Sequence, residues 1–327
     1  MTTDLKPLIV KELETLRQAD LAQKNVFPAR AYATAIQALQ GVSGPIVKLE
    51  DVEGLKGVGG KIKLKIQEIL ETGKLKAADD ARAKLPLEAY EVLQKVHGIG
   101  PAKAKTLIAA GITTLEGLRK ASQETPTLLT TAQKLGLKYY DDALLRIPRQ
   151  EMVEHESLVV SGLDEQFEGT VVGSYRRGAE SSGDIDVLLT LPDTLSKKAQ
   201  GELFEEMVSL FKEFYIVDTL SSGPTKFLGY ARVDDKHPVR RLDLLMVPKS
   251  EYAYAILYFT GSQQFNVAFR SYALDKGYTL NEHRMEPTHE GVPPVPPMKT
   301  EQDIFAFLGL QYVEPTLRRD AKDVQAA

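Results

Sequence analysis

The strongest restriction on the architecture of this chain comes from a glycine-rich turn that runs straight into an apolar strand with two aspartates. Residues 173–178 read GSYRRG, and residues 182–189 read SGDIDVLL. Because successive side chains of a strand point to opposite faces, we expect Asp184 and Asp186 on one face and their apolar neighbours on the other. Adjacent carboxylates repel unless a cation lies between them, and Mg²⁺ favours such oxygens while keeping positions open for phosphates. The segment therefore indicates metal-assisted phosphoryl chemistry.

The bulk properties describe an ordinary globular chain. Its 327 residues suffice for two or three domains, and the absence of cysteine excludes disulfides and thiolate metal sites. The net charge of −4 argues mildly against a nucleic-acid-binding protein, although a sum over the whole chain hides local basic patches. No apolar run reaches membrane-spanning length and the N-terminus lacks a secretory pattern, so we expect an intracellular protein that does not enter membranes.

The chain divides into a helical part and a part that contains strands. Apolar residues recur at helical spacing in the first 80 residues, and strand-like runs begin after residue 153. We expect strands at 169–172, 185–191, 215–219, 226–233 and 241–247, and helices at 197–214, 253–259 and 264–276. The predicted fold class is multi-domain α plus α/β: a helical N-terminal domain, a mixed sheet with helices, and a small α+β C-terminal subdomain.

Two glycine hairpins, each followed by a helix, repeat in the helical part. Residues 55–66 read LKGVGGKIKLKI, and residues 96–105 read VHGIGPAKAK. Glycines let a backbone approach a phosphate closely, and the free amides of a helix start attract an anion. One such turn is often only a turn, but two matching copies with basic helices favour helix-hairpin-helix motifs that bind a DNA backbone without reading bases. The residues expected to face DNA are Gly57, Gly59, Lys61, Gly98, Gly100 and Lys103.

A lysine pair follows the first hairpin. Lys61 and Lys65 are four residues apart and so lie on one helix face. Neighbouring ammonium groups lower each other's pKa, which improves one of them as an amine nucleophile. The alternative is a phosphate-binding pair without a covalent role, and the residues alone favour that alternative.

A third carboxylate comes from a later strand. Residues 240–246 read RRLDLLM, so a period of two places Arg241, Asp243 and Leu245 on one face. If this strand neighbours residues 185–191, Asp243 joins the first two carboxylates. Three carboxylates can hold two Mg²⁺ ions about 3.5–4 Å apart for in-line phosphoryl transfer. The alternative is a surface ion pair between Asp243 and an adjacent arginine.

These segments together resemble the family X DNA polymerases, nearest to the beta type. Residues 173–186 resemble the palm motif, residues 257–262 (LYFTGS) the nucleotide-selection motif, and residues 146–152 (RIPRQEM) the junction before the palm. With both hairpins, the resemblance covers nearly the whole chain in order. It implies a nucleotidyltransferase palm and four parts: a helical lyase-like domain (1–80), a duplex-binding subdomain (81–145), the palm (146–249) and a nucleotide-selection subdomain (250–327).

The resemblance implies roles for individual residues. Asp184, Asp186 and Asp243 would hold two Mg²⁺ ions, with Mn²⁺ as an alternative metal. Tyr258 would disfavour a ribose 2′-hydroxyl through its backbone, and Arg270 would contact the template side. The Gly261–Ser262 peptide bond would be cis. The remaining implied nucleotide contacts are Arg146, Ser174, Arg177, Ser182, Gly183, Phe259, Gly261, Gln263 and Asn266, and Arg241 would face DNA.

For the N-terminal domain the resemblance reverses the preference for a non-covalent lysine pair. Lys65 falls at the position of a Schiff-base lysine that removes a 5′-deoxyribose phosphate, with Lys61 on the phosphate and Tyr32 in the same pocket. The resemblance also places Na⁺ or K⁺ on hairpin carbonyls. Those carbonyls belong to Glu53, Leu55 and Val58 in the first hairpin, and to Gln94, Val96 and Ile99 in the second.

Several positions depart from the family pattern. Pro28, Ala77 and Glu53 stand where lysines are expected, which predicts weaker 5′-phosphate binding and a slower lyase. Leu245 replaces an arginine that pairs with the second metal-ligand aspartate in the open state of the beta enzyme, and Gln263 replaces an aspartate over the incoming base. The balance between open and closed states is therefore expected to differ.

The resemblance implies a monomeric, template-directed DNA polymerase of base excision repair. It would fill short gaps in gapped or nicked double-stranded DNA from deoxynucleoside triphosphates. It would be nuclear in a eukaryote and cytoplasmic in a bacterial or viral setting. Two alternatives stay open: a template-independent or end-joining nucleotidyltransferase with the same palm, and a DNA-end-binding scaffold without catalysis. Retention of all three aspartates speaks against the scaffold.

Overall fold

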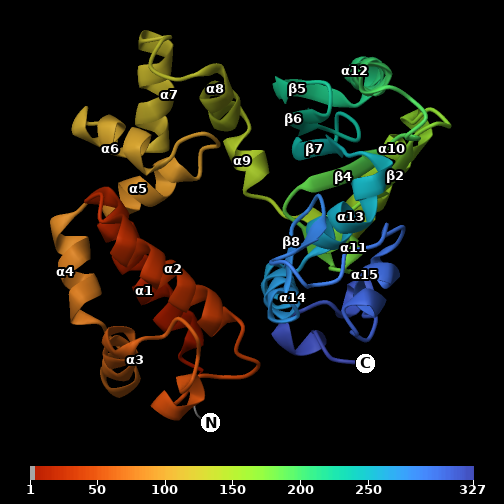
Figure 1. Cartoon of the computed structure of the whole chain (residues 1–327). Coiled ribbons are helices and arrows are strands. Elements are labelled where there is room, and N and C mark those ends of the chain that lie inside the picture. The colour runs from red at the N-terminus through yellow and green to blue at the C-terminus, as the bar shows by residue number, and fades with distance from the viewer. Residues whose placement is uncertain (1–3) are drawn as a thin grey trace. The chain divides into compact units, whose positions relative to one another are not determined.

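The computed structural model describes residues 4–327, which form two compact units (Figure 1). The first unit ends at Tyr140 and the second is Asp141–Ala327. The first is helical, and the second combines helices with a mixed sheet. The predicted α plus α/β fold class is confirmed, whereas the four-part division with boundaries at residues 80, 145 and 249 remains a prediction.

The first unit has two apolar cores, one for each glycine hairpin. Ile9, Leu39 and Ile66 belong to the first core, and Leu93 and Leu107 to the second. Its helices are α1 (Lys6–Ala22), α2 (Val26–Gln40), η1 (Leu49–Val52), α3 (Gly60–Thr72), α4 (Lys76–Lys84), α5 (Leu87–Gln94), α6 (Pro101–Ala109), α7 (Leu115–Glu124) and α8 (Thr131–Lys138). The short helix α9 (Tyr140–Ala143) begins at the last residue of the unit.

The second unit is built on a five-stranded sheet with strand order β2-β4-β7-β6-β5. The strands are β1 (Ile147–Pro148), β2 (Glu168–Val171), β3 (Ser181–Ser182), β4 (Ile185–Thr190), β5 (Ile216–Ser222), β6 (Lys226–Ala231), β7 (Arg240–Met246), β8 (Tyr278–Leu280) and β9 (Met285–Pro287). The helices are α10 (Arg149–Gly162), α11 (Gly173–Arg176), α12 (Lys197–Phe214), η2 (Lys249–Glu251), α13 (Tyr252–Thr260), α14 (Gln263–Asp275), α15 (Glu301–Phe307), η3 (Pro315–Leu317) and η4 (Ala321–Asp323).

Strands β4 and β7 are parallel neighbours, and this pairing positions the candidate site. Their register places Asp186 opposite Asp243 and Ile185 opposite Leu242. The other pairings in this sheet are antiparallel. The prediction that the strand with Asp243 lies next to the strand with Asp186 is therefore confirmed.

Burial alternates along β7, as the sequence predicted. Leu242, Leu244 and Met246 are buried, whereas Arg241 and Asp243 are half-buried. The buried side chains join a core to which α10 and α12 contribute. Helix α13 covers part of the opposite face, where apolar residues of β4 and α13 pack together. The carboxylates therefore lie on the α13 side of the sheet, not on the side of the main core.

Two details differ from the sequence expectation. Asp184 lies in an exposed bend directly before β4, because the ladder to β7 begins only at Ile185. Strand alternation therefore does not place its side chain. The short pair β1–β3 was not predicted, and the short strands expected in the C-terminal subdomain were given no positions, since strands of two or three residues are too short to produce a period.

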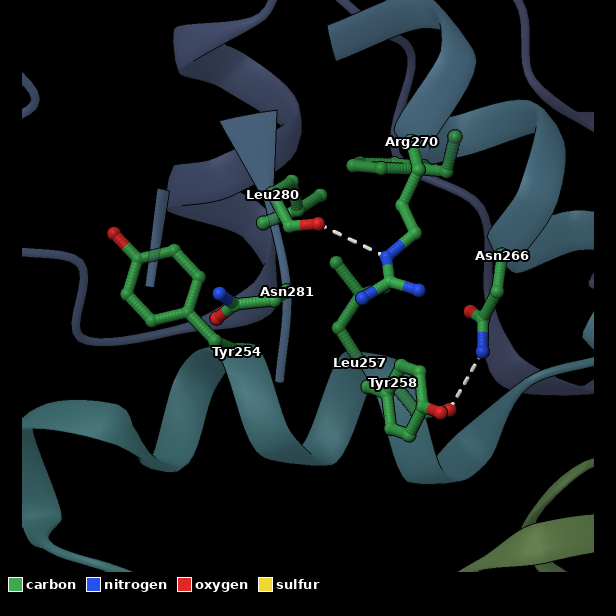
Figure 2. A pocket seen from close by; sticks show the side chains of 8 residues that line it. Tyr254, Leu257, Tyr258, Asn266, Arg270, Leu280 and Asn281 are labelled. Carbon is green, nitrogen blue, oxygen red and sulfur yellow. Dashed lines mark hydrogen bonds between the residues drawn. The ribbon is translucent and has the colours of Figure 1, made fainter. Parts of the chain in front are cut away.

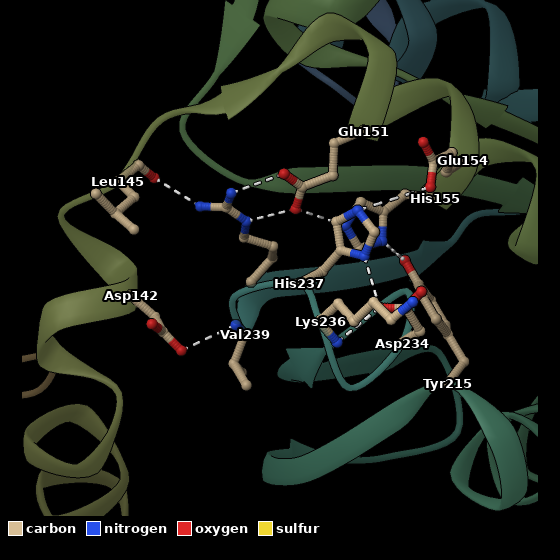
Figure 3. Close-up of polar contacts among 11 residues, drawn as sticks. Asp142, Leu145, Glu151, Glu154, His155, Tyr215, Asp234, Lys236, His237 and Val239 are labelled. Carbon is tan, nitrogen blue, oxygen red and sulfur yellow. Dashed lines mark hydrogen bonds and ion pairs between the residues drawn. The ribbon is translucent and has the colours of Figure 1, made fainter.

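A buried ion pair joins the start of β7 to the start of α10. The Arg240 guanidinium donates to both carboxylate oxygens of Glu151, at 2.7 and 2.8 Å, and to the carbonyl oxygen of Leu145 at 3.0 Å. Nearby, the backbone amide of Val239 donates to Asp142 (2.9 Å; Figure 3). These contacts attach residues 142–145 to the palm-like sheet.

A buried histidine lies against the same ion pair. His155 is fully buried, with Nδ1 2.9 Å from the hydroxyl of Tyr215 and Nε2 3.5 Å from Glu151 (Figure 3). Nε2 makes no hydrogen bond in the part of the chain that the structure describes. Burial lowers the pKa of His155 to about 4, although the Glu151 carboxylate acts in the opposite direction.

This histidine predicts an acid-sensitive fold. From pH 6.5 down to about 4 the unfolded chain binds a proton at His155 that the folded chain does not, so stability falls with pH in this window. We expect a loss of about 3 kcal/mol in the free energy of unfolding, at about 1.4 kcal/mol per pKa unit. Urea unfolding between pH 7 and 4 measures it. The non-titrating variant His155→Gln should give a flatter profile, and identical profiles would contradict the assignment.

Candidate active site

Two carboxylates meet across the β4–β7 pairing. Asp186 and Asp243 are register partners, and both are half-buried. Burial, together with the charges of Asp184 and Asp243, raises the pKa of Asp186 to about 7. Burial also raises the pKa of Asp243, although Arg241 opposes this by donating a hydrogen bond to its carboxylate. The site therefore concentrates negative charge that one arginine only partly compensates.

The donor set fits a divalent cation that binds oxygen. In residues 4–327, no group of three histidine, cysteine or acidic side chains already converges closely enough to hold a metal ion. Asp184 lies in the bend before the strand, and Asp243 is paired with Arg241. Burial, followed by the charges of Asp184 and Asp243, raises the pKa of Asp186, and a bound cation would favour its ionised form. Carboxylate oxygens are the ligands that Mg²⁺ prefers.

The glycine-rich turn lies directly beside these carboxylates. Gly173 has a φ of +63°, and a Cβ added there would lie 3.1 Å from Oδ2 of Asp186. Only glycine meets both conditions without strain. Gly173 begins one turn of helix, α11, in which the Ser174 hydroxyl donates to the hydroxyl of buried Ser182 at 3.0 Å. The turn therefore joins the start of β4 at its acidic end.

Arg146 closes the same end. Its guanidinium donates to the carbonyl oxygen of Ser181 at 2.6 Å and to the Ser181 hydroxyl at 3.1 Å. A Cβ on Gly183 would lie 3.4 Å from the Arg146 guanidinium. The structure thus places Arg146 beside Ser181 and Gly183, and a role for Arg146 and Gly183 in nucleotide contact remains a prediction.

The two arginines of the turn hold the end of α13. Arg177 donates to the carbonyl oxygen of Thr260 at 2.6 Å, and Arg176 donates to the Thr260 hydroxyl at 2.6 Å. Burial lowers the pKa of Arg177. The Gly261–Ser262 peptide bond that follows is cis, as expected. The arginines therefore tie the glycine-rich turn to the segment that carries Tyr258 and Phe259.

Sequence reasoning missed a buried ion cluster behind these arginines. Glu301 accepts from Arg176 at 2.7 Å and from the fully buried Arg318. Burial opposes ionisation of Glu301, but the two arginines outweigh it and lower its pKa. Arg176 stands in the motif that the sequence highlights, yet no spacing rule links it to a glutamate 125 residues later.

Residues of α13 and α14 surround a small pocket (Figure 2). Tyr258, Asn266 and Arg270 line it, together with Leu257 and Leu280. Asn266 donates to the carbonyl oxygen of Tyr258 at 2.7 Å, and the Tyr258 ring packs edge to face with Phe259. Gln263 begins α14 directly after the cis bond. The residues expected to select a nucleotide are therefore neighbours.

The two glycine hairpins have the same local geometry. Leu55 accepts the amide of Val58, and Val96 accepts the amide of Ile99. The second glycine of each GxG sequence is the N-cap of the helix that follows: Gly59 caps α3 and Gly100 caps α6. Neither glycine has a side chain that could bond to the free amides of its helix. Among residues 4–327, setting aside each glycine and its immediate chain neighbours, no neighbouring heavy atom is found within 4 Å of a Cβ built on either N-cap glycine. Both helix starts therefore leave amides and space for an anion.

The lysines near the hairpins differ in their surroundings. Lys61 is exposed and Lys65 half-buried on α3, and neither makes an ion pair with the residues that the structure describes. Tyr32 packs against the same apolar core. Lys103 behaves differently, because its ammonium group donates to the carbonyl oxygen of Leu128. That bond would have to break before Lys103 could contact a phosphate.

The first hairpin offers a matched pair of glycine variants. Gly57 has a φ of +96°, and an added Cβ would lie 2.6 Å from Thr34, so Gly57→Ala should lower the free energy of unfolding by about 1–3 kcal/mol. Gly59 has neither restriction, but glycine is preferred to alanine at an N-cap, so Gly59→Ala should cost less than Gly57→Ala, about 0.5–1 kcal/mol, and should weaken DNA binding several-fold. Hydrogen exchange in α3 and fluorescence anisotropy with DNA measure the two effects. Equal stability of the two variants would refute the turn assignment.

Comparison with known proteins matches family models to four successive parts of the chain. In chain order, these are a helix-hairpin-helix domain at residues 4–75, the fingers domain of DNA polymerase lambda at 91–144, the DNA polymerase beta palm at 146–249 and the DNA polymerase beta thumb at 255–319. The palm match includes all three aspartates of the candidate site. The thumb match includes Tyr258, Asn266 and Arg270 of the pocket.

Two curated relatives extend this similarity. DNA polymerase lambda of Rattus norvegicus is 35% identical over 329 residues, covering 95% of this chain and 56% of that protein. DNA polymerase lambda of Arabidopsis thaliana is 33% identical over 304 residues, covering 87% of this chain and 56% of that protein. The chain thus spans just over half the length of these relatives. The motifs alone favoured the beta type, while the matches carry both the beta and the lambda names. The chain belongs to the family X DNA polymerases.

Proposed function

We propose that this chain is a template-directed DNA polymerase that fills short gaps during base excision repair. The observation that carries this proposal is the parallel pairing of β4 with β7, which sets Asp186 beside Asp243 at the glycine-rich turn. Its substrates would be gapped or nicked double-stranded DNA and deoxynucleoside triphosphates. We also propose that it works as a monomer.

The glycine-rich turn would bind the triphosphate. Ser174 offers a hydroxyl at the start of α11, and Arg177 and Arg146 offer guanidinium donors that suit phosphate oxygens. In the structure both arginines donate to carbonyl oxygens instead, so phosphate binding would exchange these bonds. Because Arg177 also donates to the carbonyl oxygen of Thr260, that exchange would release the end of α13 that carries Tyr258.

Family membership implies use of divalent metal ions, and we propose that Asp184, Asp186 and Asp243 hold two Mg²⁺ ions. When bound, such ions neutralise triphosphate charge and lower the pKa of an attacking hydroxyl. Arg241 would have to release Asp243 for this, and its guanidinium would then be available to DNA. Mn²⁺ would substitute, since it accepts the same ligands.

The first unit would hold DNA through both hairpins. Uncapped helix starts at Gly59 and Gly100 would contact the backbone phosphates on the two sides of a gap. The hairpin carbonyls, Leu55 and Val96 among them, would bind Na⁺ or K⁺ against the phosphate. Such binding would weaken steeply with salt.

We further propose a 5′-deoxyribose phosphate lyase in the first unit. The Lys65 amine would attack C1′ of the incised abasic sugar and form a Schiff base with loss of water. Loss of a C2′ proton would then break the bond between C3′ and its oxygen and release the DNA end, and water would hydrolyse the imine to free the lysine and the 5′-deoxyribose phosphate. Lys61, one turn away on α3, would bind that phosphate. The charge lost at Glu53, Pro28 and Ala77 predicts a slow lyase.

Location within the cell stays a prediction: intracellular, and nuclear in a eukaryote. In the described residues 4–327, no helix is long and apolar enough to cross a membrane.

Replacing Asp243 tests the polymerase proposal. Asp243→Asn should lower gap filling of a labelled primer in Mg²⁺ by a factor on the order of 10² to 10³, the scale of losing one preorganised charge. Gap binding should change less than about twofold, because the hairpins carry it. Asp235→Asn, an exposed change in the loop before β7, is the matched control.

The choice of DNA separates the rival functions in the same assay. Extension of a primed gap but not of an unpaired single strand supports template direction. Comparable extension of both indicates a template-independent or end-joining transferase. Binding without extension by the wild type indicates an end-binding scaffold and overturns the proposal.

Borohydride trapping tests the lyase. Hydride reduces the imine to a stable amine, so wild-type protein should be cross-linked to an incised abasic DNA. Lys65→Ala should lose at least about nine-tenths of this product, because it removes the nucleophile. Lys63→Ala, on the same helix, should retain it. Unchanged trapping by Lys65→Ala would mean that another amine forms the Schiff base.

A further inference from the structure

Arg270, which we propose contacts the template, is engaged by the protein itself. Its Nε donates to the carbonyl oxygen of Leu280 at 2.9 Å (Figure 2), and its Nη2 lies 3.5 Å from a carboxylate oxygen of Glu282. The guanidinium also lies 5.2 Å from the ring centroid of Tyr258. The side chain is still 41% exposed, so these bonds lie at the surface, within reach of a ligand.

Asn266 is engaged in the same way. Its amide donates to the carbonyl oxygen of Tyr258 at 2.7 Å (Figure 2). Asn266 and Arg270, the two α14 side chains that we assign to the new base pair, therefore both contact Tyr258 of α13. Substrate would have to replace these internal bonds before either side chain could read a base pair.

The turn that presents Glu282 is fixed on both sides. Oδ1 of Asn281 accepts the backbone amides of His283 at 2.8 Å and Arg284 at 2.9 Å. His283 Nδ1 lies 2.8 Å from a carboxylate oxygen of Glu251. A turn held in this way positions Glu282 without help from its ion pair.

Glu282 is paired with Arg270, and the nearby arginine of the same turn has another partner. Arg284, in the same turn, is paired with Glu286 at 2.9 Å. Glu282 is 35% exposed, so its pair with Arg270 is partly screened by water and can be exchanged for substrate contacts. An ion pair of this strength can favour the Glu282-bound position of Arg270 and still allow Arg270 to move to substrate.

The geometry points to a latch, formed by the Glu282 carboxylate and the Leu280 carbonyl, that holds Arg270 away from the nascent base pair. Resting on the proposed polymerase function, this makes Glu282 a specificity-determining positioning residue. A correctly paired nucleotide supplies enough contacts to release Arg270, whereas a mismatch supplies fewer and leaves it latched. Discrimination then depends on a residue that touches neither DNA nor nucleotide.

Removing the carboxylate should therefore favour errors. Glu282→Gln should raise kcat/KM for a mismatched nucleotide by about two- to fivefold, the range of a half-exposed ion pair, and leave the matched nucleotide nearly unchanged. Glu286→Gln, on the same hairpin, removes an ion pair that does not involve Arg270 and should change neither value. A fold defect would instead lower both values together.

A double mutant tests whether the effect passes through Arg270. Arg270→Ala should lower kcat/KM for the matched nucleotide, and adding Glu282→Gln to it should have no further effect on discrimination. Unchanged discrimination in Glu282→Gln, or an effect that persists without Arg270, would overturn the latch.

A spectroscopic readout keeps the latch testable even if polymerase activity fails. In ¹⁵N spectra of the full chain, the Arg270 Nε–H signal, assigned by its absence in Arg270→Lys, should be protected from exchange with water by its bond to the Leu280 carbonyl oxygen. Glu282→Gln should speed this exchange several-fold, and Glu286→Gln should not. Equal exchange in wild type and Glu282→Gln would overturn the latch, whereas failure of gap filling alone would overturn only the proposed function.

Discussion

The parallel pairing of β4 with β7 is the constraint on which the candidate active site depends. A shift of one residue in this register would turn Asp243 into the apolar core and bring Leu242 or Leu244 to the acidic face. The cost of burying a carboxylate there, and of exposing leucine, fixes the register. Folding thus places like charges side by side, and the resulting uncompensated charge is what a metal ion would relieve.

Several polar side chains around this site make hydrogen bonds within the protein and are also proposed to contact substrate. Arg176 and Arg177 join the glycine-rich turn to Thr260, and Arg241 holds Asp243. Asn266 and Arg270 bond within the pocket around Tyr258. Without substrate, the protein satisfies these donors internally, which avoids the penalty of unpaired buried polar groups. Substrate binding would then be an exchange of bonds, and each internal partner becomes a place where selectivity can be adjusted.

Much of the fold could be predicted from sequence because the relevant signals are local. The period of two in β7 gave the faces of Arg241 and Asp243, and helix α12 was predicted with its observed bounds of Lys197–Phe214. The position of Asp184 before the strand was not predictable, because it depends on where the ladder to β7 begins. Contacts between distant residues, such as Arg176 with Glu301 and Arg270 with Glu282, leave no periodic trace and needed the structure. The metal role of the three aspartates and the DNA-facing role of the hairpin residues came from pattern, whereas the roles of single residues in nucleotide contact came from family resemblance.

The central claim is that Asp184, Asp186 and Asp243 form one metal site beside the glycine-rich turn. The most direct measurement is anomalous diffraction from Mn²⁺ in crystals of the full chain with gapped DNA, a chain-terminated primer and a nucleotide. We expect Mn²⁺ at bonding distance from Asp186 and Asp243, with the Arg241–Asp243 ion pair opened. Mn²⁺ bound elsewhere, or Asp243 still paired with Arg241 in a complex that holds nucleotide, would contradict the claim.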